Sequence, residues 1–258
     1  MLKAILALPI LFISLFSLAG TNSKDCSWDP KIKFTANLYE VIEVDDLSLL
    51  TNMHSANSEL VNKYQEHYRN QTDINQIALR KRQHAIFKKH FKNDEPSVQM
   101  MQIILDNKLG KTRTSNCLEM LLHERHLLRV GIKDETEFGA HVLLHPNKGL
   151  RILFQSSDDA TVPVSTYLYP DLKAALAEGF VLMTHIHIHP FIMSNPSGDI
   201  GGVNWPSGPG LDFGDLSVYV NLHSQYGLRE ARVTNGFDTF TLSPKEFVFL
   251  KNLKPNQK

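Results

Sequence analysis

The spacing of apolar residues changes near residue 131, and this change limits the fold more than any other feature of the chain. Between about residues 45 and 132, apolar side chains recur three and four positions apart, as at Leu60, Tyr64 and Tyr68. Such spacing is typical of amphipathic helices. Beyond residue 131, short apolar runs alternate with turn residues, which is typical of strands. We therefore expect the two parts of the chain to differ in secondary structure.

The second part reads as strands and helices in alternation. A hairpin is expected around the turn at His145–Gly149, and a strand is expected at 180–189. Helices are expected at 170–178, at 215–226 and at 243–253, where Ser243 is the expected N-cap and Pro244 the first helical residue. These patterns predict an α+β fold. A helical N-terminal region at 20–130 precedes a mixed α/β domain at 131–258.

The first 20 residues are typical of an export signal. Lys3 precedes an apolar run from Ala4 to Leu18, and small residues follow at the expected cleavage point after Ala19. A membrane span needs about 20 apolar residues, and no later run reaches that length. We expect residues 1–19 to be a cleaved signal peptide, with an uncleaved anchor as the alternative. The mature chain is then secreted or periplasmic and has no stable membrane span.

The charge balance and the two cysteines further limit the possible partners and the cellular compartment. The 258 residues include 27 basic and 27 acidic side chains, so the formal net charge is zero. Nucleic-acid binding depends strongly on positive charge, so this balance argues against a nucleic-acid partner. Cys26 and Cys117 are the two cysteines, and in an oxidising compartment they are expected to form one disulfide. Two buried free thiols are the alternative.

Three alternating histidines are the most informative motif. His185, His187 and His189 precede Pro190 within the expected strand, with isoleucines between them. Alternate residues of a strand share a face, so the three imidazoles should project together. Imidazole nitrogens bind zinc well, but three in a row converge on one ion less easily than two. A pair of histidines with a carboxylate from elsewhere is the expected ligand set.

The carboxylate is expected from the segment that follows. Asp215 opens an expected helix, and the Gly- and Pro-rich loop before it could return it to the strand end. Its plainer role is a helix N-cap, which aspartate favours. Asp212 and Asp199 are the other candidates.

The order of these motifs resembles the JAMM (JAB/MPN-type) zinc metalloprotease superfamily. That family has a glutamate, then His-x-His-Pro, a short spacer and Ser-x-x-Asp. Here His187-Ile188-His189-Pro190 matches the second motif, and Asp212-Phe213-Gly214-Asp215 stands for the third. Glu137 takes the place of the glutamate, with Glu135 as the alternative. The resemblance covers about residues 131–242 and implies a domain with a central curved sheet.

The resemblance implies a zinc-dependent hydrolase. His187, His189 and Asp215 would bind zinc with a water as the fourth ligand, and Glu137 would take the proton of that water. The hydroxide would attack a peptide or isopeptide carbonyl in a peptide or protein substrate. Ser207 is a candidate donor to the developing oxyanion. The chain would then be an exported hydrolase of a peptide, isopeptide or related amide bond.

Two departures from the family pattern support a second hypothesis. His189 and Asp215 lie 26 positions apart, more than twice the family spacing, and Asp212 occupies the serine position. Asp199, ten positions after His189, is nearer to the family spacing. His185 could also close the fourth metal position. The alternative is therefore a non-catalytic binding module of a secreted or envelope assembly, with or without a structural metal.

Overall fold

The computed structural model describes residues 26–51, 58–90, 95–133, 136–158, 165–191, 200–212 and 214–254. The expected signal peptide, residues 1–19, lies outside the described residues. No helix in the described ranges combines the length and the apolar character that a membrane crossing requires.

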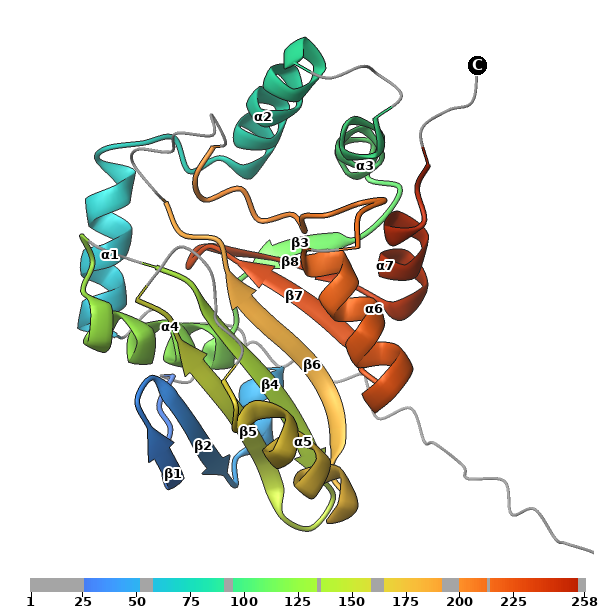
Figure 1. Cartoon of the computed structure of the whole chain (residues 1–258). Helices are drawn as coiled ribbons and strands as arrows, with labels where there is room; N and C mark the ends of the chain where they lie inside the picture. The colour runs from blue at the N-terminus through green and yellow to red at the C-terminus, as the bar shows by residue number, and fades with distance from the viewer. Residues whose placement is uncertain are drawn as a thin grey trace, which may run out of the picture.

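One mixed sheet of eight strands forms the centre of the molecule (Figure 1). Its spatial order is β1-β2-β5-β4-β6-β7-β8-β3. Neighbouring strands are antiparallel except β6 and β7, which are parallel and are connected through α6. The strands are β1 (Lys31–Ala36), β2 (Tyr39–Val44), β3 (Lys111–Thr114), β4 (Phe138–His145), β5 (Gly149–Ser156), β6 (Val181–Ile188), β7 (Glu230–Thr234) and β8 (Asp238–Leu242).

Helices cover both faces of this sheet. Leucines of α4 pack with one face, whereas apolar side chains of α5, α6 and α7 pack with the other. Helix α1 lies against α4, and α2 lies against α3 beyond the end of β6 (Figure 1). The helices are η1 (Leu47–Leu50, a 3-10 turn), α1 (Glu59–Arg69), α2 (Gln76–His90), α3 (Pro96–Leu105), α4 (Cys117–Val130), α5 (Leu168–Ala177), α6 (Asp215–Tyr226) and α7 (Pro244–Lys251).

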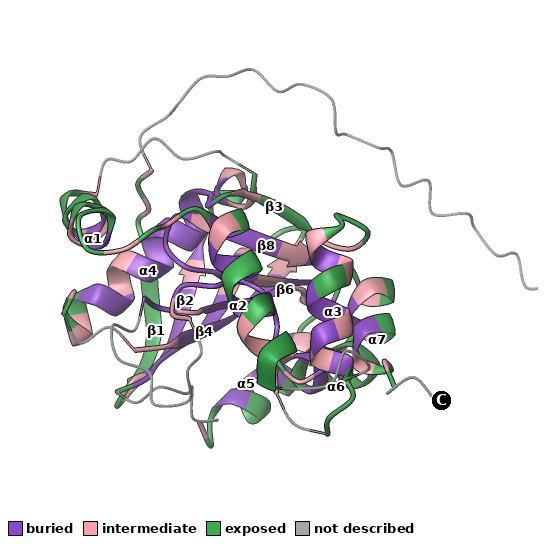
Figure 2. Ribbon diagram, turned by 90° about the horizontal axis from the view of Figure 1, so that it is seen from above, coloured by how far each residue is buried: buried purple, intermediate pink, exposed green. Residues whose placement is uncertain are grey.

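The predicted α+β class is confirmed, but the region at 20–130 is not purely helical. Within its described residues it contains four α helices and also the three strands β1, β2 and β3, which join the same sheet as the later strands. Strands β1 and β3 are the two edges, and both are largely exposed (Figure 2). The polar β3 sequence, Lys-Thr-Arg-Thr, lacks apolar alternation, so periodicity alone does not reveal it.

Strand β6 has the two-faced character that its sequence predicts. Ile186 and Ile188 pack with the leucines of α4 on one face. His185 and His187 lie on the opposite face, where both rings approach Tyr219 of α6. The alternation therefore places imidazoles on one side of a buried central strand and aliphatic side chains on the other.

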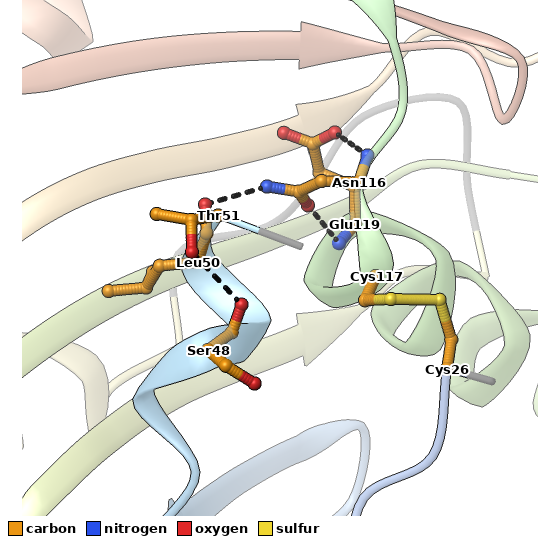
Figure 3. Close-up of a disulfide and its surroundings, with 7 residues drawn as sticks. All are labelled: Cys26, Ser48, Leu50, Thr51, Asn116, Cys117 and Glu119. Atoms are coloured by element: carbon orange, nitrogen blue, oxygen red, sulfur yellow. Dashed lines mark hydrogen bonds between the residues drawn. A yellow bond between two sulfur atoms is a disulfide. The ribbon is translucent and has the colours of Figure 1, made fainter. Parts of the chain in front are cut away.

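The expected disulfide between Cys26 and Cys117 is present (Figure 3). It connects the start of the described chain to the first residue of α4. Asn116 caps this helix: its side chain accepts from the Glu119 backbone N–H and donates to the Leu50 carbonyl. Disulfides of this kind are typical of proteins in oxidising compartments.

Loss of the disulfide should destabilise the fold. The bond spans 91 residues of sequence, and closing a loop of this length restricts the unfolded chain. We expect the Cys26→Ser/Cys117→Ser variant to lose about 2–5 kcal/mol of unfolding free energy, measured by urea denaturation. An unchanged midpoint and slope would show that the crosslink contributes nothing to stability.

A second stability effect depends on pH. His126 is fully buried between the Ser156 hydroxyl and the Thr136 carbonyl. Burial, together with repulsion from the neighbouring His123, lowers its pKa from 6.5 to about 3. As the pH falls below 6.5, His126 becomes protonated in the unfolded chain but stays neutral in the folded chain. The free energy of unfolding therefore decreases as the pH falls below 6.5.

This loss should be visible in denaturation at two pH values. At pH 5 the His126 contribution amounts to about 2 kcal/mol relative to pH 7.5. We expect the His126→Gln variant to lose about 2 kcal/mol less than the wild type over this interval. Equal losses in the two proteins would show that another group controls the acid sensitivity.

Candidate metal centre

Two histidines and one aspartate meet where β6 ends and α6 begins. His187 lies on β6, and His189 follows its last residue. Asp215 is the first residue of α6 and follows Gly214, whose φ of 94° lets the chain turn into the helix. The long loop between β6 and α6 thus returns to the strand that it left, as the sequence predicts for Asp215.

The three side chains converge closely enough to share one metal ion. Their ligand atoms lie within 4.8 Å of one another, and theirs is the one such group of three found in the described part of the chain. The Nε2 atoms of His187 and His189 are 3.0 Å apart, and each lies 3.4 Å from an oxygen of Asp215. Two ligands held at 2.0–2.1 Å by a tetrahedral zinc lie about 3.4 Å apart, so these separations suit such an ion.

Hydrogen bonds behind the imidazoles orient them toward this point. Nδ1 of His189 lies 3.0 Å from the Val203 carbonyl, to which it donates. Nδ1 of His187 lies 3.1 Å from the Tyr219 hydroxyl. A metal-binding histidine usually makes such a bond with its second nitrogen, which leaves Nε2 free for the metal.

The ionisable side chains of the group shift one another's pKa values. Burial lowers the pKa of His189, but Asp215, Glu137 and the Val203 carbonyl together raise it to about 9. Burial raises the pKa of Asp215, but the two imidazoles outweigh this effect and hold it well below its usual range. Asp215 is therefore a carboxylate at neutral pH. A cation that binds here must displace the His189 proton.

Glu137 lies beside the three side chains. In the antiparallel register Gly139 stands opposite His187, so Glu137, two residues earlier, approaches His189. Glu137 also lines the same cavity as the three side chains, and its charge raises the pKa of His189. Glu137 therefore lies next to the candidate metal ligands, one residue before β4 begins.

Ser207 also lies beside the candidate metal ligands, although it is not part of the Asp212–Asp215 motif. Its backbone N–H donates to Oδ2 of Asp215 at 2.7 Å, and its hydroxyl accepts from the Asp215 backbone N–H at 3.2 Å. Ser207 thus holds Asp215 at the start of α6 and lines the cavity beside it.

The other sequence candidates lie elsewhere. Asp212 is fully exposed and approaches Lys251, so it does not face the site. Asp199 and Glu135 lie outside the described residues. His185 is not a member of the converging group: its ring packs against His141, Tyr219 and His187.

Helix α2 fixes the loop that carries the site, a feature that sequence reasoning missed. Three side chains one turn apart, Gln76, Arg80 and Gln83, face this loop. The Gln76 side chain donates a hydrogen bond to the Gly202 carbonyl and accepts one from the Asn204 backbone N–H. Arg80 donates to the side-chain oxygen of Asn204, and the side-chain oxygen of Gln83 accepts from the Ile200 backbone N–H. The same loop supplies the Val203 carbonyl that orients His189. The i, i+4, i+7 spacing places these three long polar side chains on one face of the helix, and this pattern could have indicated the contact.

Comparison of the chain with models of protein families gives no match, and searches among curated proteins and among solved structures give none either.

Proposed function

We propose that the protein is an exported, zinc-dependent hydrolase of a peptide, isopeptide or related amide bond. The observation that carries the proposal is the convergence of His187, His189 and Asp215 beside Glu137 at the wall of one cavity of about 500 Å³. A cavity of this size suits a small ligand or part of a chain. The ordered resemblance to the JAMM superfamily supports the same reaction.

The donor set favours zinc in a catalytic role. Two imidazole nitrogens and one carboxylate oxygen are common zinc ligands, and three protein ligands leave one coordination position open. His185, which could have closed that position, packs against His141 instead of joining the group. When bound, zinc supplies Lewis-acid activation of water and of the scissile carbonyl.

The side chains of the chain itself provide the proton transfers. Glu137 accepts a proton from the attacking water as the new C–O bond forms, and then gives a proton to the amide nitrogen as the C–N bond breaks. Asp215 and Glu137 keep the site negative, which favours a cation. Burial and the nearby carboxylates raise the pKa of the Tyr219 hydroxyl, so it stays neutral. Its oxygen accepts the Nδ1–H of His187, which leaves Nε2 of that ring for a metal.

One observation favours the alternative of a non-catalytic binding module. Asp212 stands where the family has serine, and it faces solvent near Lys251. The Ser207 hydroxyl, which lines the cavity, accepts a hydrogen bond from the Asp215 backbone N–H. On this alternative the site, with or without a structural metal, binds a partner of a secreted or envelope assembly without cleaving it.

Export belongs to the same proposal. The N-terminal sequence to Ala19 is typical of a signal peptide, and the Cys26–Cys117 disulfide is typical of an oxidising compartment.

Reconstitution with zinc tests the hydrolase directly. The mature chain, stripped with a chelator and reloaded with zinc, is incubated with a library of quenched fluorescent peptides. We expect cleavage that the chelator removes and zinc restores. Cleavage that survives complete removal of metal would contradict the proposal. A zinc-loaded protein that binds peptides but cleaves none would favour the binding module.

A further inference from the structure

The candidate metal centre lies between two cavities. The first, of about 500 Å³, lies between β4, β6 and α6, and we call it the sheet cavity. The second, of about 400 Å³, lies between α2, α3 and the loop before α6, and we call it the helix cavity. Four residues line both cavities: Glu137, His189, Ser207 and Gly214. A ligand at the metal centre therefore has space on two sides.

The sheet cavity has neutral walls away from the centre. Its apolar lining includes Leu153, Leu168 and Val218, and its polar lining includes His141 and Gln155. Burial lowers the pKa of His141 to about 4, so this imidazole is uncharged at neutral pH. Among its described lining residues, the acidic groups are those of the centre itself, and neither lysine nor arginine is present.

The helix cavity is also lined mainly by apolar side chains. Phe87 of α2, Met100 and Met101 of α3 and Trp205 and Leu211 of the loop line it. Methionine side chains adapt to differently shaped apolar ligands. Among the lining residues that the structure describes here, the charged side chains are Glu137 and His189, both at the centre. A charged side chain would lose its hydration in either cavity without gaining a partner of opposite charge away from the centre.

We infer that the site takes an extended peptide across the metal centre, with an uncharged apolar side chain in each cavity, and cleaves the bond between them. This inference rests on the proposed function and specifies it: the enzyme is an endopeptidase with apolar preference on both sides of the scissile bond. An enzyme that trims chain ends needs space on one side of the reacting bond and a group that binds the terminus. Here chain can continue on both sides.

Blocked hexapeptides test this inference. Each peptide is N-acetylated and C-amidated, and its two central residues are both apolar, both charged, or one of each kind. We expect cleavage at the central bond, with kcat/KM at least tenfold higher for the apolar pair than for any peptide with a central charge. Cleavage that requires a free terminus, or equal rates for charged and apolar pairs, would overturn the inference and leave the hydrolase standing.

Two substitutions at the cavity rims separate the cavities. Val218 on the sheet cavity and Leu211 on the helix cavity are 42% and 44% exposed, so tryptophan can replace each without disturbing the core. Val218→Trp should lower kcat/KM severalfold for peptides with a bulky residue on one side of the scissile bond. It should leave kcat/KM unchanged for peptides with glycine at that position. Leu211→Trp should do the same for the other side. Leu128→Trp, at a 73% exposed position lining neither cavity, is the matched control.

A binding measurement keeps the two claims separate. Fluorescence anisotropy reports binding of the same blocked peptides, labelled with a dye, to zinc-loaded Glu137→Gln protein. Binding that prefers the apolar pair, with no turnover by the wild type, would support the two-sided groove and contradict the hydrolase. Neither binding nor cleavage of any blocked peptide would overturn the two-sided groove, and cleavage of the unblocked peptide library would then decide the hydrolase separately. Tryptophan variants that behave like the Leu128→Trp control would overturn the assignment of the two cavities.

Discussion

Replacement of Glu137 by glutamine should lower kcat for amide cleavage by about 10²–10⁴-fold while the zinc content stays unchanged. The substitution preserves the size of the side chain but removes the group that accepts the proton of the attacking water. Glu137 is not one of the three converging ligands, so metal binding should survive. Steady-state kinetics with the preferred blocked peptide, together with elemental analysis, measures both quantities.

A control variant makes this prediction specific. Glu59→Gln, on the exposed surface of α1, should leave kcat unchanged, because Glu59 pairs with Lys63 of the same helix and lines neither described cavity. Wild-type turnover in Glu137→Gln would contradict the assignment of Glu137 as the base.

Replacement of His187 and His189 together should abolish metal binding. The His187→Ala/His189→Ala variant keeps one ligand of three, and a lone carboxylate does not hold zinc at the affinity of a three-ligand site. Zinc at 100 times its dissociation constant should stabilise the wild type by about 2.7 kcal/mol and the variant by none. Thermal denaturation with and without zinc measures this difference.

A graded variant and a control accompany the double replacement. Tyr219→Phe removes the hydroxyl that bonds Nδ1 of His187, and should weaken zinc binding by about 10–100-fold without abolishing it. His90→Ala, at the exposed end of α2, should bind zinc like the wild type. Stoichiometric zinc in the double variant would show that the metal lies elsewhere.

The fold was predictable where periodicity and capping residues are strong. The helix at 244–251 begins with Ser243, Pro244 and the Glu246 capping contact, as its sequence indicates. Strand β6 follows from its alternating residues. The strands β1 and β2 precede the segment where helical periodicity begins, and the polar edge strand β3 interrupts that segment. Their place in the sheet depends on pairing with strands far along the chain, which local patterns do not encode.

The site was predictable in part for a similar reason. A period of two places His187 and His189 on one side of the strand end, so their proximity follows from sequence. The approach of Asp215 depends on the 26-residue loop between β6 and α6, whose described part is held by Gln76, Arg80 and Gln83 from a distant helix. The contact of Ser207 with Asp215 arises from the same loop. Such long-range contacts leave no periodic signal.

Metal content tests the central claim most directly. The mature chain is purified and analysed for bound metal as the wild type and as Asp215→Asn, Asp212→Asn and Asp199→Asn. Asp212 is the matched control, because it lies three positions from Asp215 and is fully exposed. We predict about one zinc per chain in the wild type and in the Asp212 and Asp199 variants, and loss of zinc in Asp215→Asn. Retention of zinc in Asp215→Asn, or its loss only in Asp199→Asn, would contradict the site described here.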